Sequence, residues 1–256
     1  MHEEEKLLAF GGEVAYTIHM HLPISVVIPT LNEARALPGL LKSLENQTMP
    51  PREIIVADAF SKDTTRAIAK DFGCIVIDGG LPGKGRNKGA QRASQPIILF
   101  LDADVLLSPK FLEKTYLEMR KRNLGTASCL VTPRSRDKKD KVITTLWNSW
   151  FVFLENIDPH ACGFCIFVKK DIHDRLHGFD ESILVGEDVD YVRRSVKYGK
   201  FAFLDSQKIQ ISLRRFIEEG RMKMVMKHIG ITLHNMFIGQ IRNDVFDYKF
   251  GEHKEI

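Results

Sequence analysis

The nine residues IILFLDADV, from Ile97 to Val105, join a run of five apolar residues directly to two carboxylates. A short apolar run of this kind is typical of a strand that is buried on both faces of a parallel sheet. Asp102 and Asp104 would then stand at the end of a buried strand, where an unpaired carboxylate is costly to remove from water. We therefore expect a positively charged partner at this position.

The chain around this strand alternates between short apolar runs and stretches with helical spacing, beginning at Ile24. This alternation is typical of a mainly parallel sheet flanked by helices, so we expect an α/β fold. The runs that predict strands are ISVVIPT, EIIVADA, CIVIDG, PIILFLDADV, TASCLVTP, CGFCIFVKK and KFAFLDSQKIQIS, the last as a strand or a hairpin.

Helices are predicted between these strands from apolar spacing and capping residues. A short helix is expected at GRNKGAQRAS after a glycine-rich loop, an aromatic-rich helix around Leu146 to Leu154, and an amphipathic helix at GEDVDYVRRSVKYGK. The predicted caps and inward-facing residues are Asn32 and Ser108 as N-caps, Gly73 as a helix end, and Ala67, Ile68, Phe72, Val189, Val192 and Val196 as buried positions.

The composition is that of an ordinary globular protein. The 256 residues are 44% hydrophobic and carry a net charge of +4, which is too mild to indicate nucleic-acid binding. The amino terminus is acidic and does not resemble an export signal, so the four cysteines are expected to be reduced thiols in the cytoplasm. The apolar run from Ile229 to Ile241 is too short to span a membrane.

Polar residues follow the predicted strands at their carboxyl ends, which is where open parallel sheets bind their ligands. The segments at these ends are PTLNE (29–33), DAFSKD (58–63), GKGRNKG (83–89) and DAD (102–104). Two hard oxygen ligands one residue apart can face one Mg²⁺ or Mn²⁺, and a diphosphate would complete its coordination. Lys84, Arg86, Lys88 and Arg92 could neutralise the remaining phosphate charge. The sequence therefore favours a nucleoside diphosphate site over a solvated turn.

Glu187 and Asp188 begin a predicted helix further along the chain. Transfer of a sugar to a hydroxyl needs a base to take the hydroxyl proton, and Asp188 is a suitable candidate. In the alternative interpretation, both acids merely complement the helix dipole. The metal motif upstream favours the base.

Taken in order, these motifs resemble the inverting family 2 glycosyltransferases of the GT-A fold. The segments that carry the resemblance are VVIPTLNEA, ADAFSKDTT, GKGRNKGA, FLDADV, GFCIFVKK with GFDES, and GEDVDYVRR, and together they extend over roughly Ile24 to Phe216. The ordered set is far more specific than any single member.

The resemblance implies a role for each matching residue. Asp104 would bind the metal, and Asp102, with Ala103 beside it, would hold the ribose or a metal-bound water. The Glu187–Asp188 pair would supply the base, with attack opposite the leaving group and inversion at the anomeric carbon. The nucleotide pocket would be lined by Pro29, Thr30, Asn32 and Glu33, with Asp58 accepting from the base, Lys84 near the phosphates and Arg86 reaching the base or the diphosphate.

We therefore predict a metal-dependent inverting glycosyltransferase that moves a sugar from a UDP- or GDP-sugar to a glycan or lipid-linked hydroxyl. A nucleotidyltransferase is the alternative enzyme, although its glycine-rich loop should follow the first strand. A different class is a non-catalytic module that binds nucleotide sugars or a membrane surface. The Cys162–Cys165 spacing lacks the further ligands of a zinc site, so small residues beside the acceptor are the preferred interpretation.

Three regions are predicted: an extension at 1–23, the transferase domain at 24–213, and a basic then apolar helical segment at 214–256. Arg214 and Arg215 form a solvated basic face or, by resemblance, close over the diphosphate. The segment as a whole could pack on the domain, form a homodimer, or contact the inner face of a membrane peripherally. Packing or dimerisation ranks first, and His228 and His234 are expected in a core or interface rather than as metal ligands.

Overall fold

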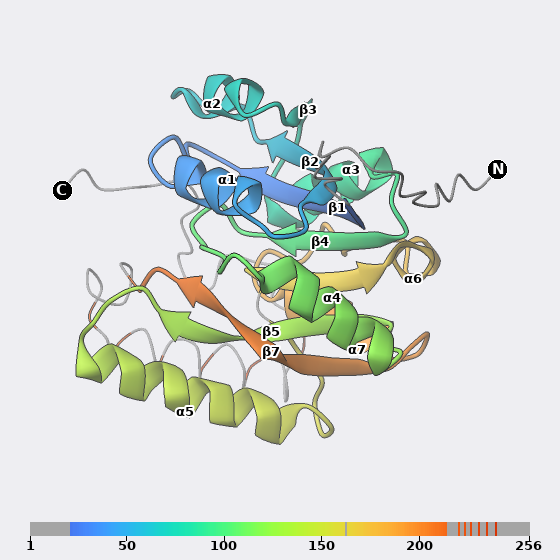
Figure 1. Ribbon diagram of the computed structural model, residues 1–256. Helices are drawn as coiled ribbons and strands as arrows, with labels where there is room; N and C mark the ends of the chain where they lie inside the picture. The colour runs from blue at the N-terminus through green and yellow to red at the C-terminus, as the bar shows by residue number, and fades with distance from the viewer. Residues whose placement is uncertain are drawn as a thin grey trace, which may run out of the picture.

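The computed structural model describes residues 21–161 and 163–213, with single positions at 220, 223, 226, 230, 234 and 239. Within these residues seven strands form one sheet in the order β3-β2-β1-β4-β6-β5-β7 (Figure 1). Only β6 runs antiparallel to its neighbours among them. The strands are β1 (Leu22–Thr30), β2 (Pro51–Asp58), β3 (Ile75–Asp78), β4 (Ile97–Leu101), β5 (Thr126–Pro133), β6 (Cys165–Lys169) and β7 (Phe201–Ile211).

Helices cover both faces of this sheet. On one face α1, α2, α4 and α5 pack on a core layer that includes Leu99 and Leu101, and on the other α3, α6 and α7 pack on a layer that includes Ile98 and Phe100. The helices are α1 (Leu37–Glu45), α2 (Thr65–Asp71), α3 (Pro82–Arg92), α4 (Phe111–Lys121), α5 (Lys138–Leu154), α6 (Lys170–Arg175) and α7 (Glu187–Ser195).

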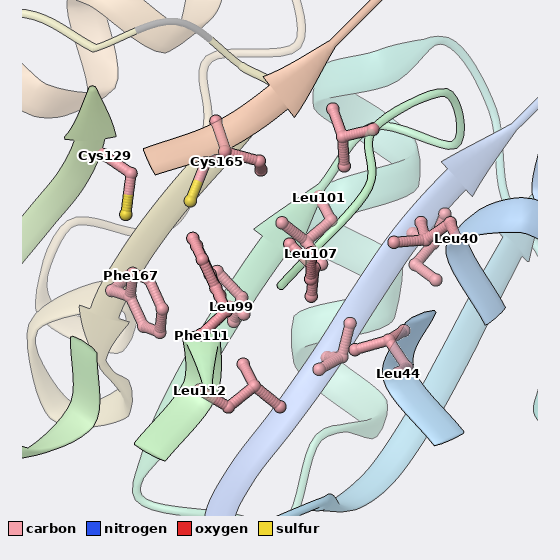
Figure 2. Close-up of a cluster of buried hydrophobic side chains, with 14 of the residues drawn as sticks. Leu40, Leu44, Leu99, Leu101, Leu107, Phe111, Leu112, Cys129, Cys165 and Phe167 are labelled. Atoms are coloured by element: carbon pink, nitrogen blue, oxygen red, sulfur yellow. The ribbon is translucent and has the colours of Figure 1, made fainter. Parts of the chain in front are cut away.

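The central strand β4 confirms the prediction from its sequence. All five of its residues are buried, because alternate side chains enter the two core layers. Figure 2 shows the first of these layers, where Leu99 lies near Phe111 and Leu112 of α4 and Leu40 and Leu44 come from α1. Asp102 therefore follows a strand that has no polar residue of its own.

The helix predicted at GRNKGAQRAS (85–94) is confirmed as α3, but its start was predicted too late. Helix α3 begins at Pro82, so Gly83 and Lys84 lie in the helix and not in a loop before it. The helix lies directly on β1: a Cβ added at Gly89 would come within 2.2 Å of Val27 Cγ1. Glycine is needed there for close packing, and this contact overrides its weak helix propensity.

Two predicted N-caps lie outside their helices. Helix α1 begins at Leu37, and Asn32 instead adopts a left-handed conformation with φ 54°. Its side-chain oxygen accepts from the backbone N–H of Lys62, so Asn32 joins two loops. Helix α4 begins at Phe111 rather than after Ser108, whose carbonyl accepts from the Phe111 N–H in a turn.

Other details of the helices also differ from the predictions. In α7 Val192 is buried, but Val196 follows the end of the helix and is 39% exposed. Tyr191 points inward instead, and its ring stacks on Phe179 with the ring centroids 3.9 Å apart. In α2 Ala69 is buried and Ala67 is exposed, whereas the predicted helix end at Gly73 is confirmed by its φ of 71°. The remaining corrections are that α5 begins at Lys138 and that β1 begins at Leu22. Of the two alternatives for KFAFLDSQKIQIS, the strand is confirmed as β7.

The predictions for both ends of the chain fall largely outside the described residues. These include most of the 1–23 extension and, apart from the single positions, the 214–256 segment. Among the residues that the structure describes, we find no helix with the length and hydropathy needed to cross a bilayer.

Candidate active site

The predicted polar groups meet at the carboxyl edge of the parallel strands. Strands β1 and β2 end at Thr30 and Asp58, and Asp102 directly follows β4. Helix α3 contributes Arg86 to the same edge, and α7 contributes Glu187 through the hydrogen bonds described next. The structure thus brings together residues that lie up to 101 positions apart in the chain.

Arg86 is the positive group that meets the carboxylate after β4. Its guanidinium donates to Asp102 Oδ1 at 3.0 Å, to Glu187 Oε1 at 2.6 Å and to the Gly163 carbonyl at 3.2 Å. Its side chain is only 3% exposed and lies over the Phe179 ring, 5.5 Å from the ring centroid. Because both terminal nitrogens of Arg86 already donate hydrogen bonds to protein acceptors, Arg86 acts here as a clamp between the end of β4 and the start of α7.

Asp188 stands beside this clamp without a hydrogen bond to the Arg86 guanidinium. Its Oδ2 accepts from the Gly163 N–H at 2.5 Å and its Oδ1 from the Val189 N–H at 2.8 Å. Burial, followed by the nearby Glu187 carboxylate, raises the pKa of Asp188 to about 7, although the Arg86 charge opposes the shift. A carboxyl group with this pKa can both take and release a proton near neutral pH.

Asp102 and Asp104 differ in their surroundings. The Asp102 side chain is 41% exposed beyond its contact with Arg86, Asp104 is exposed, and Ala103 is buried between them. In the described part of the chain no group of three or more His, Cys, Asp or Glu side chains is arranged to hold a metal. The two carboxylates of Asp102 and Asp104 fit Mg²⁺ or Mn²⁺, because these ions take one or two protein carboxylates and fill their coordination with phosphate oxygens and water.

Asp58 is fully buried and already holds several hydrogen bonds. Its carboxylate accepts from the Thr30 hydroxyl at 3.0 Å, from the N–H and hydroxyl of Ser61 at 3.0 and 2.5 Å, and from Arg66 at 3.3 Å. In this structure Asp58 therefore fixes the loop after β2. Its predicted contact with a nucleotide base stays a prediction.

The remaining predicted pocket residues surround the same loops. The Asn32 N–H donates to the Ser61 hydroxyl, and the Glu33 N–H donates to the Thr65 hydroxyl, both at 2.8 Å. Pro29 lies beneath α3, where a Cβ added at Gly85 would be 3.2 Å from Pro29 Cβ. Lys84 is exposed on α3, and its predicted contact with the phosphates stays a prediction.

The sequence did not reveal the part played by Gly163 and Phe179. A Cβ at Gly163 would lie 2.4 Å from an Arg86 nitrogen, so only glycine lets the guanidinium reach the carbonyl. Phe179 is held by Asn87, whose amide accepts from the Phe179 N–H at 2.8 Å and donates to its carbonyl at 2.9 Å. The GFC and GFD segments were visible, but their contacts with α3 were not.

The model of the family "Glycosyl transferase family 2" matches residues 25–176, which is more than half of the chain. The chain belongs to glycosyl transferase family 2. The match begins within β1 and extends through α6, so it includes Asp102 and Asp104, whereas Glu187 and Asp188 lie beyond it. The predicted family is thereby confirmed, but the match does not reach the predicted base.

Relatives of this family 2 member support the same assignment. Glycosyltransferase AglE of Haloferax volcanii is 26% identical over 200 residues, which cover 69% of this chain and 62% of AglE. The chain thus spans less than two thirds of that relative. The poly(ribitol-phosphate) β-N-acetylglucosaminyltransferase TarS of Staphylococcus aureus is 25% identical over 149 residues, 52% of this chain and 26% of TarS.

Solved structures show the same fold. TarS residues 1–349 in complex with UDP-GlcNAc gives a TM-score of 0.59 at 18% identity, covering 75% of this chain and 58% of that one. The mannosyltransferase PcManGT of Pyrobaculum calidifontis, in complex with GDP-Man and Mn²⁺, gives a TM-score of 0.61 at 20% identity. That match covers 75% of this chain and 56% of the PcManGT chain. The predicted GT-A fold is confirmed.

Proposed function

We propose that this protein is a metal-dependent inverting glycosyltransferase that uses a nucleoside diphosphate sugar. One observation carries the proposal: the buried Arg86 guanidinium binds both Asp102, which follows β4, and Glu187, which begins α7. This contact sets the proposed donor site beside Asp188, the proposed base. The nucleotidyltransferase alternative is weaker, because Leu31 to Glu33 follow β1 and the glycine-rich segment is α3.

The donor would lie along the carboxyl edge of β1, β2 and β4. Asp102 and Asp104 would hold Mn²⁺ or Mg²⁺ together with the diphosphate, and the cation would offset charge on the departing phosphates. The complexes of TarS with UDP-GlcNAc and of PcManGT with GDP-Man and Mn²⁺ support a UDP- or GDP-sugar. The exposed Lys84 would add a positive charge next to the phosphates.

In the transfer step the acceptor hydroxyl would give its proton to a carboxylate oxygen of Asp188. The hydroxyl oxygen then bonds to the anomeric carbon while the bond from that carbon to the diphosphate breaks, so the nucleoside diphosphate leaves with the electron pair. Asp188 suits this role better than Glu187, because the Glu187 carboxylate is bound by Arg86 at 2.6 Å. The poly(ribitol-phosphate) in the name of TarS supports a hydroxyl group on a larger molecule as the acceptor, and for this chain the acceptor would be a glycan or a lipid-linked hydroxyl.

The substitution Asp104→Asn tests the donor site. Calorimetry with UDP and GDP should show that the variant loses most of the Mn²⁺-linked affinity, by about tenfold or more, because a neutral amide attracts the cation far less. Asp171→Asn is the matched control, since Asp171 is exposed on α6. Unchanged Mn²⁺ dependence in Asp104→Asn would remove the metal from this motif. Donor binding without any transfer or hydrolysis would favour the non-catalytic binding module.

A further inference from the structure

Helix α5 has a second, exposed row of apolar side chains beside its buried side. On its inner side Phe151 and Leu154 are buried, and Ile143 and Trp147 pack against the core. A second row is exposed: four of its members follow at spacings of four, four and three residues, which places them along one line of α5, and the fifth lies in the turn just after the helix ends at Leu154. This outer stripe consists of Val142, Leu146, Trp150, Phe153 and Ile157, which are 57%, 66%, 47%, 63% and 63% exposed.

The outer stripe is unusual for a helix on the surface of a protein. Such helices normally present polar residues to solvent, as α4 does with Leu117 as its one large exposed apolar residue. In the outer stripe five large side chains follow one another, and the ring centroids of Trp150 and Phe153 are 6.0 Å apart. Contiguous apolar surface of this kind marks a site of interaction.

A cluster of cations stands at the amino-terminal end of the same helix. We call residues 134–141 the basic segment: it carries five exposed cations against one exposed and one buried aspartate. The cations are Arg134, Arg136, Lys138, Lys139 and Lys141. The surface of α5 therefore combines apolar and aromatic side chains with positive charge, which is the composition of helices that lie in a membrane interface.

We propose that α5 docks onto an anionic lipid surface, with the outer stripe in the interface and the basic segment at the headgroups. The chain that follows β7 supports a lipid partner. Strand β7 ends beside the basic segment, where the Arg134 N–H donates to the Ile211 carbonyl at 3.1 Å. The sequence after this point is also basic, with Arg214, Arg215, Arg221, Lys223 and Lys227. One anionic surface can bind both of these basic stretches.

The same charges argue against a second copy as the partner. Antiparallel pairing of two α5 helices would bring the basic segment of one copy to the carboxyl-terminal end of the other. The acids at that end are already used, since Glu155 accepts from the Phe203 N–H and Asp158 pairs with Arg193 at 2.6 Å. A lipid surface supplies the negative charge that another copy lacks.

Docking in this way would place the candidate active site near the lipid headgroups. Strand β5 runs in the same direction as β4, so α5 starts at the edge of the sheet that carries Asp102 and Asp104. Arg134 of the basic segment donates to the Asp104 carbonyl at 3.4 Å. The docking surface and the candidate active site are thus directly connected.

Vesicle flotation of the full chain tests this proposal. We expect the protein to float with vesicles of phosphatidylglycerol and phosphatidylcholine, weakly with phosphatidylcholine alone, and less as salt rises. Leu146→Ser with Phe153→Ser should weaken the partition by about tenfold or more, since each serine removes apolar burial. Leu117→Ser is the matched control because it changes an exposed leucine on α4, which is 56% exposed against 66% for Leu146. Flotation that is absent, or unchanged in the double variant, would overturn the proposal.

Fluorescence of Trp150 separates the lipid from protein partners. The chain has two tryptophans, both in α5, so Trp147→Phe leaves Trp150 as the only reporter. Its emission should shift to the blue on addition of anionic vesicles and be quenched by brominated lipid. Without vesicles, acrylamide should quench it freely. Shielding of Trp150 from acrylamide would show that residues 214–256 or a second copy of the chain cover the outer stripe. Sedimentation of the wild type and the Leu146→Ser, Phe153→Ser variant would distinguish the two, because only a second copy changes the mass of the particle. Either result overturns the proposal.

Discussion

At the scale of single residues, the candidate site is an excess of negative charge around one buried cation. Arg86 lies near the carboxylates of Asp102, Glu187 and Asp188, and it forms hydrogen bonds with the first two. Asp188 is left to hydrogen bonds from backbone N–H groups, and burial raises its pKa to about 7. The surplus negative charge favours a bound cation and a carboxylate that readily accepts a proton.

The substitution Asp188→Asn should separate chemistry from binding. Transfer should fall by about 10²-fold or more, because the amide cannot take the acceptor proton, while donor affinity in calorimetry is retained. In the wild type, transfer should rise with pH through about 7, as the carboxyl group ionises. Equal losses of binding and transfer would instead show a structural role.

The same pKa predicts how stability depends on pH. The folded-state pKa of Asp188 lies above its ordinary value of 3.8, so the folded chain binds more protons between these two values. Its contribution to stability is therefore lost as pH rises from 3.8 to about 7. When the free energy of unfolding is measured in denaturant at pH 5 and at pH 8, it should fall less between the two pH values for Asp188→Asn than for the wild type. A parallel loss in both proteins would contradict the raised pKa.

At the scale of elements, α3 owes its place to close contact with β1. The helix has a glycine at 83, 85 and 89, and the third meets Val27. This contact holds α3 where Arg86 reaches β4 and where Asn87 reaches Phe179. The geometry of the site is therefore set by a packing contact outside it.

The substitution Gly89→Ala should destabilise the protein by about 1–3 kcal/mol in denaturant unfolding, because the added methyl group clashes with Val27. Helix propensity alone predicts the opposite sign, a gain of up to about 1 kcal/mol. Gly83→Ala is the matched control in the same helix, where the added Cβ would meet its neighbours at 3.7–3.9 Å and should be tolerated. Adding Val27→Ala should recover part of the loss; no recovery would argue against this contact.

At the scale of the whole molecule, one sheet carries both core layers. Strand β4 contributes Leu99 to one layer and Phe100 to the other, and β6 joins β4 to the β5–β7 half of the sheet. All seven strands of the described residues belong to this one sheet. We therefore propose that residues 24–213 unfold as one domain.

The substitutions Leu99→Ala and Phe100→Ala test this unity. They should lower stability by about 2–5 and 3–5 kcal/mol respectively, because each leaves a cavity in a different layer. During unfolding in denaturant, the helix signal in circular dichroism and the fluorescence of the two α5 tryptophans should nevertheless change together in a single transition. Separate transitions for the two probes in either variant would show two folding units.

The sequence by itself determined the strands β1 to β6, the carboxylates after β4 and the acids that begin α7. Apolar runs and turn residues are local signals, so they could be recognised without knowledge of neighbouring elements. It could not show that α3 begins at Pro82, that Tyr191 points inward, or that α5 exposes an apolar side. Only the tertiary structure decided that Arg86 joins Asp102, Gly163 and Glu187, because contacts across 16, 77 and 101 residues depend on how α3, β4 and α7 pack.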